Sequence, residues 1–297
     1  MNAVVLDAMR ERVKQMDSLP ASPTVVRPLL YCLEQPLEEV EMQKIIELIS
    51  CEESLVAQCL HMANSPLFGR GRPVETVRGA VVALGMRRLR NLLLSCCLMR
   101  LQPKEKWLID PAAFWEHSFG CGLLSRHFAE KIRFHDPEKA YLAGLLHDIG
   151  ELVNVIVFPE EFRAATELVF SENLPFYEAE KISPGFTHCD TGYLLAEHWE
   201  LSEDVTQVIL HHHDVEQAKI HTVLVAIVSL SDLLCRMRHL GYGIYEPAQV
   251  DFLSDPAWTI LTREYPYLSD FDLARFTFEL DDFVEGVSKL VASVFRR

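Results

Sequence analysis

Hydrophobic residues along most of this chain repeat at helical spacing. Apolar side chains recur every three or four positions through 42–49 and again through 55–62, which predicts two short helices. Alternating apolar and polar positions bounded by turn residues are scarce, so the pattern predicts an all-α protein. The helical period predicts further helices over 77–84, 87–99, 114–132, 138–146, 162–170, 190–199, 202–211 and 221–240.

Turn-forming residues separate these predicted helices. The run Asn64-Ser65-Pro66 ends one of them, because proline disfavours helical geometry in the residue before it. Gly85 ends the helix over 77–84, and the polar segment 101–106, which contains a proline, is the best candidate for a linker. An apolar stripe near the C-terminus must dock on another surface, and it comprises Phe276, Leu280, Phe283, Val284, Val287, Leu290, Val291 and Val294.

Composition and charge narrow the function classes. The chain has 297 residues and a formal net charge of −15, from 28 Lys and Arg against 43 Asp and Glu. This charge repels nucleic-acid phosphates and anionic membrane surfaces, so neither is expected as a partner. No apolar run approaches the roughly 18 residues that suggest a membrane span. Eight cysteines without a C-x-x-C pair, and a start without a signal-peptide pattern, favour a reduced, cytoplasmic protein.

One basic cluster interrupts this acidic composition. It contains Arg87, Arg88, Arg90 and Arg100, and it lacks interleaved aromatic residues and a helix-turn-helix pattern. A solvated helix face is therefore favoured over a nucleic-acid contact.

The segment Leu145–Gly150 carries the most informative chemistry. An apolar helix here ends in adjacent His147 and Asp148, and Gly150 suits a helix C-terminus. An imidazole beside a carboxylate forms a mixed nitrogen and oxygen donor pair that suits Zn, Fe or Mn, and the carboxylate can bridge two ions. An isolated His-Asp pair is usually solvated or caps a helix, so the pair gains meaning only from further donors.

Further donors lie on the predicted helices around this pair. Asp232 lies inside the apolar stretch VSLSDLL, where a carboxylate must be paired, protonated or bound to a cation, because burial of an isolated charge is very unfavourable. It could bind a metal, or it could pair with Arg236 one helical turn later, and the residues leave both readings open. The other donors are His117, His188, His212 and His213.

Short motifs in a fixed order extend these observations. They comprise Leu19–Pro23, Ala63–Gly69, Ala80–Gly85, Trp115–Ser118, Gly144–Gly150, His188–Gly192, Trp199 and His212-His213. This series, which covers about residues 17–240, resembles the HDOD branch of the HD-domain superfamily. The resemblance implies an N-terminal helical subdomain over 1–105, packed on an HD-like helical bundle over 106–242, with a C-terminal helical extension over 243–297.

The resemblance also implies a set of metal ligands. They are His117, His147, Asp148 and Asp232 for one ion, with His188, His212 and His213 added in members that carry two. All seven positions hold the required residue type. The implied cofactor is a divalent transition metal, Fe, Mn or Zn, as one or two ions. Because HDOD members are generally regarded as regulatory output modules, no residue is assigned a catalytic role.

Three departures from related hydrolases count against catalysis. Glu151 stands where the HD-GYP cyclic-dinucleotide phosphodiesterases have a lysine suited to a substrate phosphate, and an anion there would repel phosphate. The G-Y-P loop expected after His213 is absent, and Ala113 cannot supply a carboxylate found in some members with larger metal clusters. The motifs also lack a Lys or Arg for the phosphoryl oxygens, and Arg126 is the nearest candidate.

The predicted function is therefore a non-catalytic signal-transduction module that retains a metal site and acts with another signalling protein. The alternative is a metal-dependent phosphohydrolase acting on a nucleotide or cyclic dinucleotide, so a small nucleotide ligand is a second predicted partner. Glu151 and the missing loop favour the module, whereas the complete ligand set favours the enzyme. Glu180 lies where the family commonly has an acidic residue, but a solvated helix charge explains it equally well.

Overall fold

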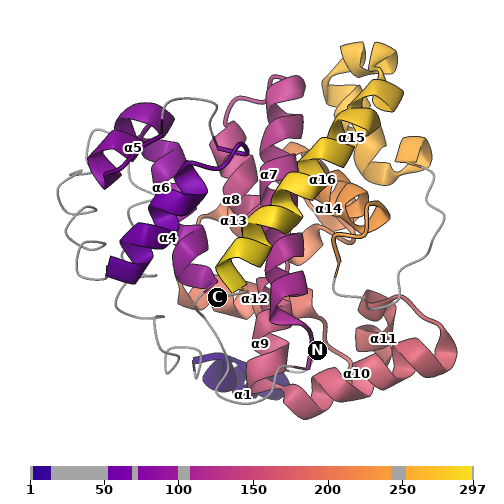
Figure 1. The fold of residues 1–297 in the computed structure, drawn as a ribbon. Helices are drawn as coiled ribbons and strands as arrows, with labels where there is room; N and C mark the ends of the chain where they lie inside the picture. The colour runs from indigo at the N-terminus through magenta and orange to yellow at the C-terminus, as the bar shows by residue number, and fades with distance from the viewer. Residues whose placement is uncertain (1–2, 15–52, 69–72, 100–107, 242–251, 296–297) are drawn as a thin grey trace. The chain divides into compact units, whose positions relative to one another are not determined.

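A computed structural model describes residues 3–14, 53–68, 73–99, 108–241 and 252–295. Within these residues all regular structure is helical, which confirms the predicted all-α class (Figure 1). Short 3₁₀ helices lie at η3 (Val215–Gln217), η4 (Phe252–Ser254) and η5 (Pro266–Asp270). The α-helices are α1 (Ala3–Val13), α4 (Glu53–Ala63), α5 (Val77–Leu84), α6 (Met86–Leu98), α7 (Pro111–Lys131), α8 (Pro137–Leu146), α9 (Ile149–Val157), α10 (Pro159–Glu172), α11 (Phe176–Ile182), α12 (His188–His198), α13 (Glu203–His211), α14 (Thr222–Met237), α15 (Pro256–Glu264) and α16 (Leu273–Phe295).

Most of these helices follow the predicted hydrophobic pattern. α5 has the predicted bounds, and Gly85 ends it with a φ of +82°, which glycine adopts without steric cost. The pattern did not predict α1, α9, α11 or α15. The helix predicted over 42–49 and the linker predicted over 101–106 lie outside the described residues.

The chain divides into two compact units. The site unit comprises Met1–Met16 and Pro103–Val284, and the small unit comprises Asp17–Gln102 and Glu285–Arg297. These units group the first residues with the site unit and divide residues 243–297, the expected extension, between the two units. The Arg12 guanidinium contributes to this grouping, since it pairs with Glu161 at 2.8 Å and donates a hydrogen bond to the carbonyl oxygen of Val157.

Aspartate followed by proline begins three helices of the site unit. The carboxylates of Asp110, Asp136 and Asp255 accept hydrogen bonds from backbone N–H groups in the first turns of α7, α8 and α15. Proline at the first helical position is preorganised for the helix and lacks the N–H that would need a partner. α7 packs extensively on α8 and also on α14, whereas α12 packs on α9 and α13 (Figure 1).

Gly150 corrects the interpretation of the His-Asp segment. It lies in the first turn of α9, which begins at Ile149, and it does not end a helix. A Cβ atom at Gly150 would lie 1.8 Å from the carbonyl oxygen of His188, so only glycine allows α9 and α12 to approach this closely. The segment therefore forms a tight link between α8 and α9 and brings that link against the start of α12.

Burial tests several other sequence predictions. Arg90 is buried whereas Arg87 is exposed, so the basic cluster is not one solvated face. The C-terminal stripe is buried at Phe276, Leu280, Val287, Leu290 and Val291, as its docking requires. The cysteines within the described residues are free and buried, as predicted for small core residues, and they are Cys59, Cys96, Cys97, Cys121, Cys189 and Cys235.

One stretch, Pro137–Val157, is long and apolar enough to cross a membrane by length and composition alone. The prediction that no such stretch exists was therefore wrong on these criteria. However, 94% of its most apolar window is buried inside the structure, and a core helix meets the same criteria. The stretch contains α8, α9 and the link that carries His147 and Asp148.

Candidate metal centre

The seven predicted ligands lie on or beside six helices and converge on one site. His117 lies on α7 and Asp232 on α14, His188 is the first residue of α12, and His212 and His213 follow the end of α13. His147 follows α8, and Asp148 precedes α9. A capping box between Thr187 and Asp190 fixes the start of α12, so local sequence places His188 at the N-terminus of that helix.

The first group of donors, here called the inner cluster, comprises His117, His147, Asp148 and Asp232. His117 Nε2 lies 3.2 Å from Asp232 Oδ1 and 3.4 Å from Asp148 Oδ2. His147 Nε2 lies 3.2 Å from Asp148 Oδ2 and 3.8 Å from Asp232 Oδ1. All four side chains are buried.

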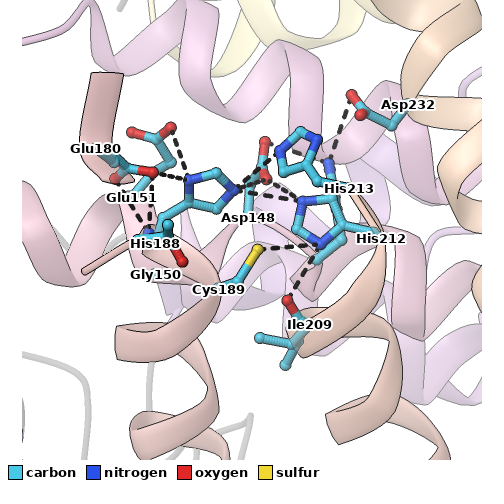
Figure 2. Close-up of polar contacts among 12 residues, drawn as sticks. Asp148, Gly150, Glu151, Glu180, His188, Cys189, Ile209, His212, His213 and Asp232 are labelled. Atoms are coloured by element: carbon cyan, nitrogen blue, oxygen red, sulfur yellow. Dashed lines mark hydrogen bonds and ion pairs between the residues drawn. The ribbon is translucent and has the colours of Figure 1, made fainter. Parts of the chain in front are cut away.

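The second group, here called the outer cluster, comprises Asp148, His188, His212 and His213. Asp148 Oδ1 lies 3.2 Å from His212 Nε2 and 3.5 Å from His188 Nε2. His213 Nε2 lies 3.1 Å from His188 Nε2. Figure 2 shows these three imidazoles gathered around the Asp148 carboxylate. His213 is partly exposed, whereas the other members of the cluster are buried.

Hydrogen bonds at the Nδ1 atoms fix the protonation of the imidazoles. His117 Nδ1 lies 2.5 Å from the carbonyl oxygen of Leu240, and His147 Nδ1 lies 2.7 Å from that of Gly144. His212 Nδ1 lies 3.1 Å from the carbonyl oxygen of Ile209. Because a carbonyl only accepts, each Nδ1 carries a proton, and each Nε2 is directed to the centre of the site, where it presents a lone pair once it is deprotonated.

The Glu180 carboxylate anchors the remaining buried imidazole. Glu180 Oε2 accepts a hydrogen bond from His188 Nδ1 at 2.6 Å, and the His188 backbone N–H donates to Glu180 Oε1 at 3.0 Å. Asn154 Nδ2 also donates to Glu180 Oε1 at 3.0 Å. Glu180 is 2% exposed, so its interpretation as a solvated helix charge was wrong. The carboxylate instead orients a predicted ligand from behind.

Glu151 lies on the same side of His188. Its Oε1 atom is 3.7 Å from His188 Nδ1, and the side chain is buried. This position is behind the imidazole and away from its Nε2 atom, which faces Asp148 (Figure 2). The negative charge of Glu151 therefore does not stand among the converging Nε2 donors.

Asp232 pairs with Arg236, as one of its two sequence readings expects, and its second oxygen is left for the cluster. Its Oδ2 atom pairs with Arg236 Nη2 at 2.7 Å, and its Oδ1 atom faces His117 Nε2. One carboxylate oxygen thus neutralises the neighbouring guanidinium while the other is directed toward the inner cluster. Arg126, the candidate for phosphate contact, instead lies near Glu138 Oε1 at 3.9 Å and over the Tyr141 ring.

Burial and charge act in opposite directions on the pKa values of the site. Burial lowers the pKa of His117, but hydrogen bonds and charge from Asp148 and Asp232 outweigh it and raise that pKa well above 6.5. Burial raises the pKa of Asp148, but the His147 charge and the surrounding hydrogen bonds hold it well below 3.8. Burial together with the charges of His212 and His188 holds the pKa of His213 well below 6.5. His213 is therefore a neutral imidazole at neutral pH.

The donor set fits divalent transition metals. The Nε2 atoms of His117 and His147 face each other at 3.3 Å, and those of His188 and His212 at 3.4 Å. Such pairs repel unless a proton or a cation lies near them. Imidazole nitrogen with carboxylate oxygen is the mixture that Zn, Fe and Mn accept, so the clusters could hold these ions.

A pocket of about 380 Å³ adjoins the outer cluster. Its walls include His213, Arg236, Lys181 and the ring of Tyr177, and the full lining is Pro175, Tyr177, Glu178, Lys181, His213, Asp214 and Arg236. Lys181 and Arg236 are cations that the sequence motifs did not reveal, because α11 was not predicted and Arg236 was considered only as a partner of Asp232.

Comparisons with known proteins agree with this architecture. A family model described as HDOD domain matches residues 19–215. The crystal structure of an HDOD domain protein with unknown function from Geobacter sulfurreducens is 30% identical, with a TM-score of 0.82, and the match covers 97% of this chain and 99% of that one. A "Putative phosphohydrolase" from Shewanella amazonensis SB2B shares the fold at 22% identity, with a TM-score of 0.72 and coverage of 95% and 98%.

A curated relative shows that the matched region also occurs in longer proteins. An uncharacterized protein of Treponema pallidum (strain Nichols) is 28% identical over 228 residues, which is 75% of this chain. The match spans 43% of the length of that relative.

Proposed function

This chain belongs to the HDOD domain family, and we propose that it is a regulatory module that holds two divalent transition-metal ions. One ion would be held by the inner cluster and one by the outer cluster. Fe, Mn and Zn are the candidates, because each accepts imidazole and carboxylate donors together. The module would act on another signalling protein in the cytoplasm.

The position of the Asp148 carboxylate carries this proposal. Its Oδ2 atom lies 3.2 and 3.4 Å from the inner imidazoles, and its Oδ1 atom lies 3.2 and 3.5 Å from two outer ones. A carboxylate that bridges two ions uses its oxygens in this divided way. The remaining donors of each cluster surround the oxygen that faces them, which is the arrangement a dinuclear site requires.

The charges of the pocket favour regulation over catalysis. Lys181 pairs with Glu178 at 3.0 Å, and Arg236 pairs with Asp232 at 2.7 Å, so each cation already faces a carboxylate. Phosphoryl transfer needs cations or donors that are directed at the equatorial phosphoryl oxygens. A site whose cations are engaged in this way suits metal holding better than turnover.

The pocket supports a second candidate, a metal-dependent phosphohydrolase that acts on a nucleotide or cyclic dinucleotide. Divalent ions in such a site lower the pKa of coordinated water and polarise phosphoryl oxygens. Arg236 and Lys181 line the pocket beside His213, where they could contact a phosphate. Glu151 lies behind His188, so it opposes a bound phosphate less than its place in the sequence suggests.

Elemental analysis of protein purified without chelator tests the main proposal. We expect two ions per chain, and Asp148→Ala should lose both, whereas Asp270→Ala at an exposed position should lose neither. Turnover of bis-p-nitrophenyl phosphate with added Mn²⁺ then separates the two functions. Metal without turnover supports the module, and turnover abolished by His147→Ala supports the enzyme. Protein without bound metal contradicts both.

A further inference from the structure

A stack of side chains covers the partly exposed ligand of the outer cluster. The Tyr177 ring of α11 stacks on the His213 imidazole, with ring centroids 4.5 Å apart and planes at 30°. Lys181 Nζ also lies over this tyrosine, 4.0 Å from the ring centroid. Lys181 is held in turn by Glu178, one helical turn earlier on α11, at 3.0 Å. The stack therefore joins α11 to the segment that follows α13.

His213 needs this support more than the other imidazoles. His117, His147 and His212 are each anchored through Nδ1 on a backbone carbonyl, and His188 is anchored on Glu180. Among the described residues, no hydrogen bond fixes His213 Nδ1. Its polar contact is the one between its Nε2 atom and His188 Nε2 at 3.1 Å. The orientation of His213 is thus set by ring contacts, with Tyr177 on one face and His188 edge to face at 5.0 Å.

We propose that Tyr177 is a positioning residue, which sets the affinity of the outer cluster for its ion by holding His213 toward Asp148 and His188. This inference rests on the proposed function, because it requires an ion in the outer cluster. The ring acts through shape, since it limits rotation of an imidazole that borders an open pocket. No inner-cluster residue belongs to the stack, so affinity at the inner cluster is independent of Tyr177.

Zn²⁺ titration of the chelator-treated full chain, followed by calorimetry, tests this role. The wild type should bind two ions. Tyr177→Leu should bind the first ion as before and the second about tenfold more weakly, a typical effect of losing a residue that orients a ligand. Tyr177→Phe keeps the ring and should remain within about twofold of the wild type. Tyr193→Leu on α12, a tyrosine whose hydroxyl instead bonds Glu197, is the matched control and should leave both ions unchanged.

Co²⁺ absorption separates positioning from a general structural defect. Tyr177→Leu should change the visible bands of the second Co²⁺ equivalent and leave those of the first equivalent unchanged, whereas a structural defect would change both. If leucine lowers the melting temperature of the metal-free chain, Tyr177→Met fills more of the same volume and serves in its place. Unchanged affinity for both ions in the leucine and methionine variants overturns the role of Tyr177.

His213→Ala distinguishes failure of this inference from failure of the proposed function. It should abolish binding of the second ion and retain the first. A wild type that takes up no ion, or a His213→Ala chain that still binds two, contradicts the metal assignment itself. A wild type with two ions and a Tyr177→Leu chain with the same two affinities contradicts only the role of the tyrosine.

Discussion

The inner and outer clusters share one carboxylate but differ in what holds their other ligands. His117 and His147 of the inner cluster are at most 1% exposed, and both donate Nδ1–H to backbone carbonyls. In the outer cluster, His188 is anchored on the Glu180 side chain, and His213 is held by the Tyr177 ring beside a pocket. Both inner imidazoles are thus fixed by the backbone, whereas two of the three outer imidazoles depend on side chains and the third, His212, is anchored on the carbonyl oxygen of Ile209.

This difference predicts unequal behaviour of two ions that have similar ligands. A backbone carbonyl within or beside a packed helix cannot rotate away, so the inner imidazoles stay oriented when a nearby side chain changes. A carboxylate or an aromatic ring is removed by a single substitution, and the imidazole that it orients is then free to turn. We therefore expect an inner ion that is retained tightly and an outer ion that is sensitive to substitution and to exchange with solvent.

The largest expected effects come from removing one ligand of each cluster. His117→Ala should lower the affinity for the inner ion more than about 100-fold, because it removes a direct donor. His213→Ala should lower the affinity for the outer ion to the same extent. Elemental analysis after dialysis should find one ion per chain in each variant. If either substitution removes both ions or neither, the division into two clusters around Asp148 is wrong.

The next largest effect should be a difference in the rates at which a chelator removes the two ions. Because His213 borders the pocket and the inner ligands are buried, EDTA should remove the outer ion at least about tenfold faster than the inner one. Release of Co²⁺, followed by its visible absorption, should show two phases of equal amplitude. A single phase would show that both ions leave through one common opening of the site unit.

The sequence predicted which side chains converge much better than it predicted the residues that support them. The seven donors could be found because the motifs are short and local, and because Asp232 lies in an apolar stretch where a carboxylate needs a counter-charge. Helical periodicity also found most of the helices, including the bounds of α5. These features depend on neighbouring residues, which a single sequence displays directly.

The supports depend on contacts between helices, which periodicity does not report. Glu180 and Tyr177 lie on α11, a helix of seven residues between prolines at 175 and 184 that shows too little apolar pattern to predict. Nor does the sequence indicate that Glu151 lies behind His188, because that requires the angle between α9 and α12. The close approach at Gly150, which sets this angle, was interpreted as a helix end instead.

Glu180 provides a sharper test of side-chain support. Glu180→Gln removes the charge that orients His188, so affinity for the outer ion should fall about tenfold while the inner ion is unchanged. Glu172→Gln, at an exposed position at the end of α10 and outside the stack and the pocket, is the control and should change neither affinity. The measurement is the Zn²⁺ titration of the chelator-treated chain. Equal weakening of both ions would indicate a general loss of structure rather than a local role.

The pH dependence of the metal-free chain follows from the pKa shifts of the ligands. Burial opposes the charged forms, but neighbouring carboxylates raise the pKa values of His117, His147 and His188 well above 6.5. Their protonated forms therefore stabilise the folded chain below pH 6.5, and this contribution is lost as the pH rises through the raised values. The pKa of His212 is raised as well. Three groups act in the opposite direction: His213 and His211, whose pKa values are lowered, and the Cys189 thiol, where burial raises the pKa but the charges of His212 and His188 lower it to about 7.

The melting temperature of the chelated protein should therefore fall by about 2 °C or more between about pH 6 and about pH 8. Added metal should reverse this trend, because the ligands must be deprotonated to bind it and its stabilising effect grows with pH. His117→Ala in the metal-free state should flatten the profile. A melting temperature that rises with pH in the absence of metal would contradict the arrangement of charges in the inner cluster.

The smallest expected effect comes from substituting Glu151. It tests whether the outer cluster depends on negative charge near His188 or on a close hydrogen bond to it. Its Oε1 atom lies 3.7 Å from His188 Nδ1, whereas the Glu180 oxygen lies at 2.6 Å and accepts the hydrogen bond. Glu151→Gln removes the charge but no close hydrogen bond to the imidazole, so affinity for the outer ion should change by less than about threefold. Zn²⁺ titration of the Glu151→Gln and Glu180→Gln chains under identical conditions measures the ratio of their affinities for the outer ion. If the two substitutions lower the affinity for the outer ion equally, that affinity depends on negative charge near His188 and not on the anchoring hydrogen bond.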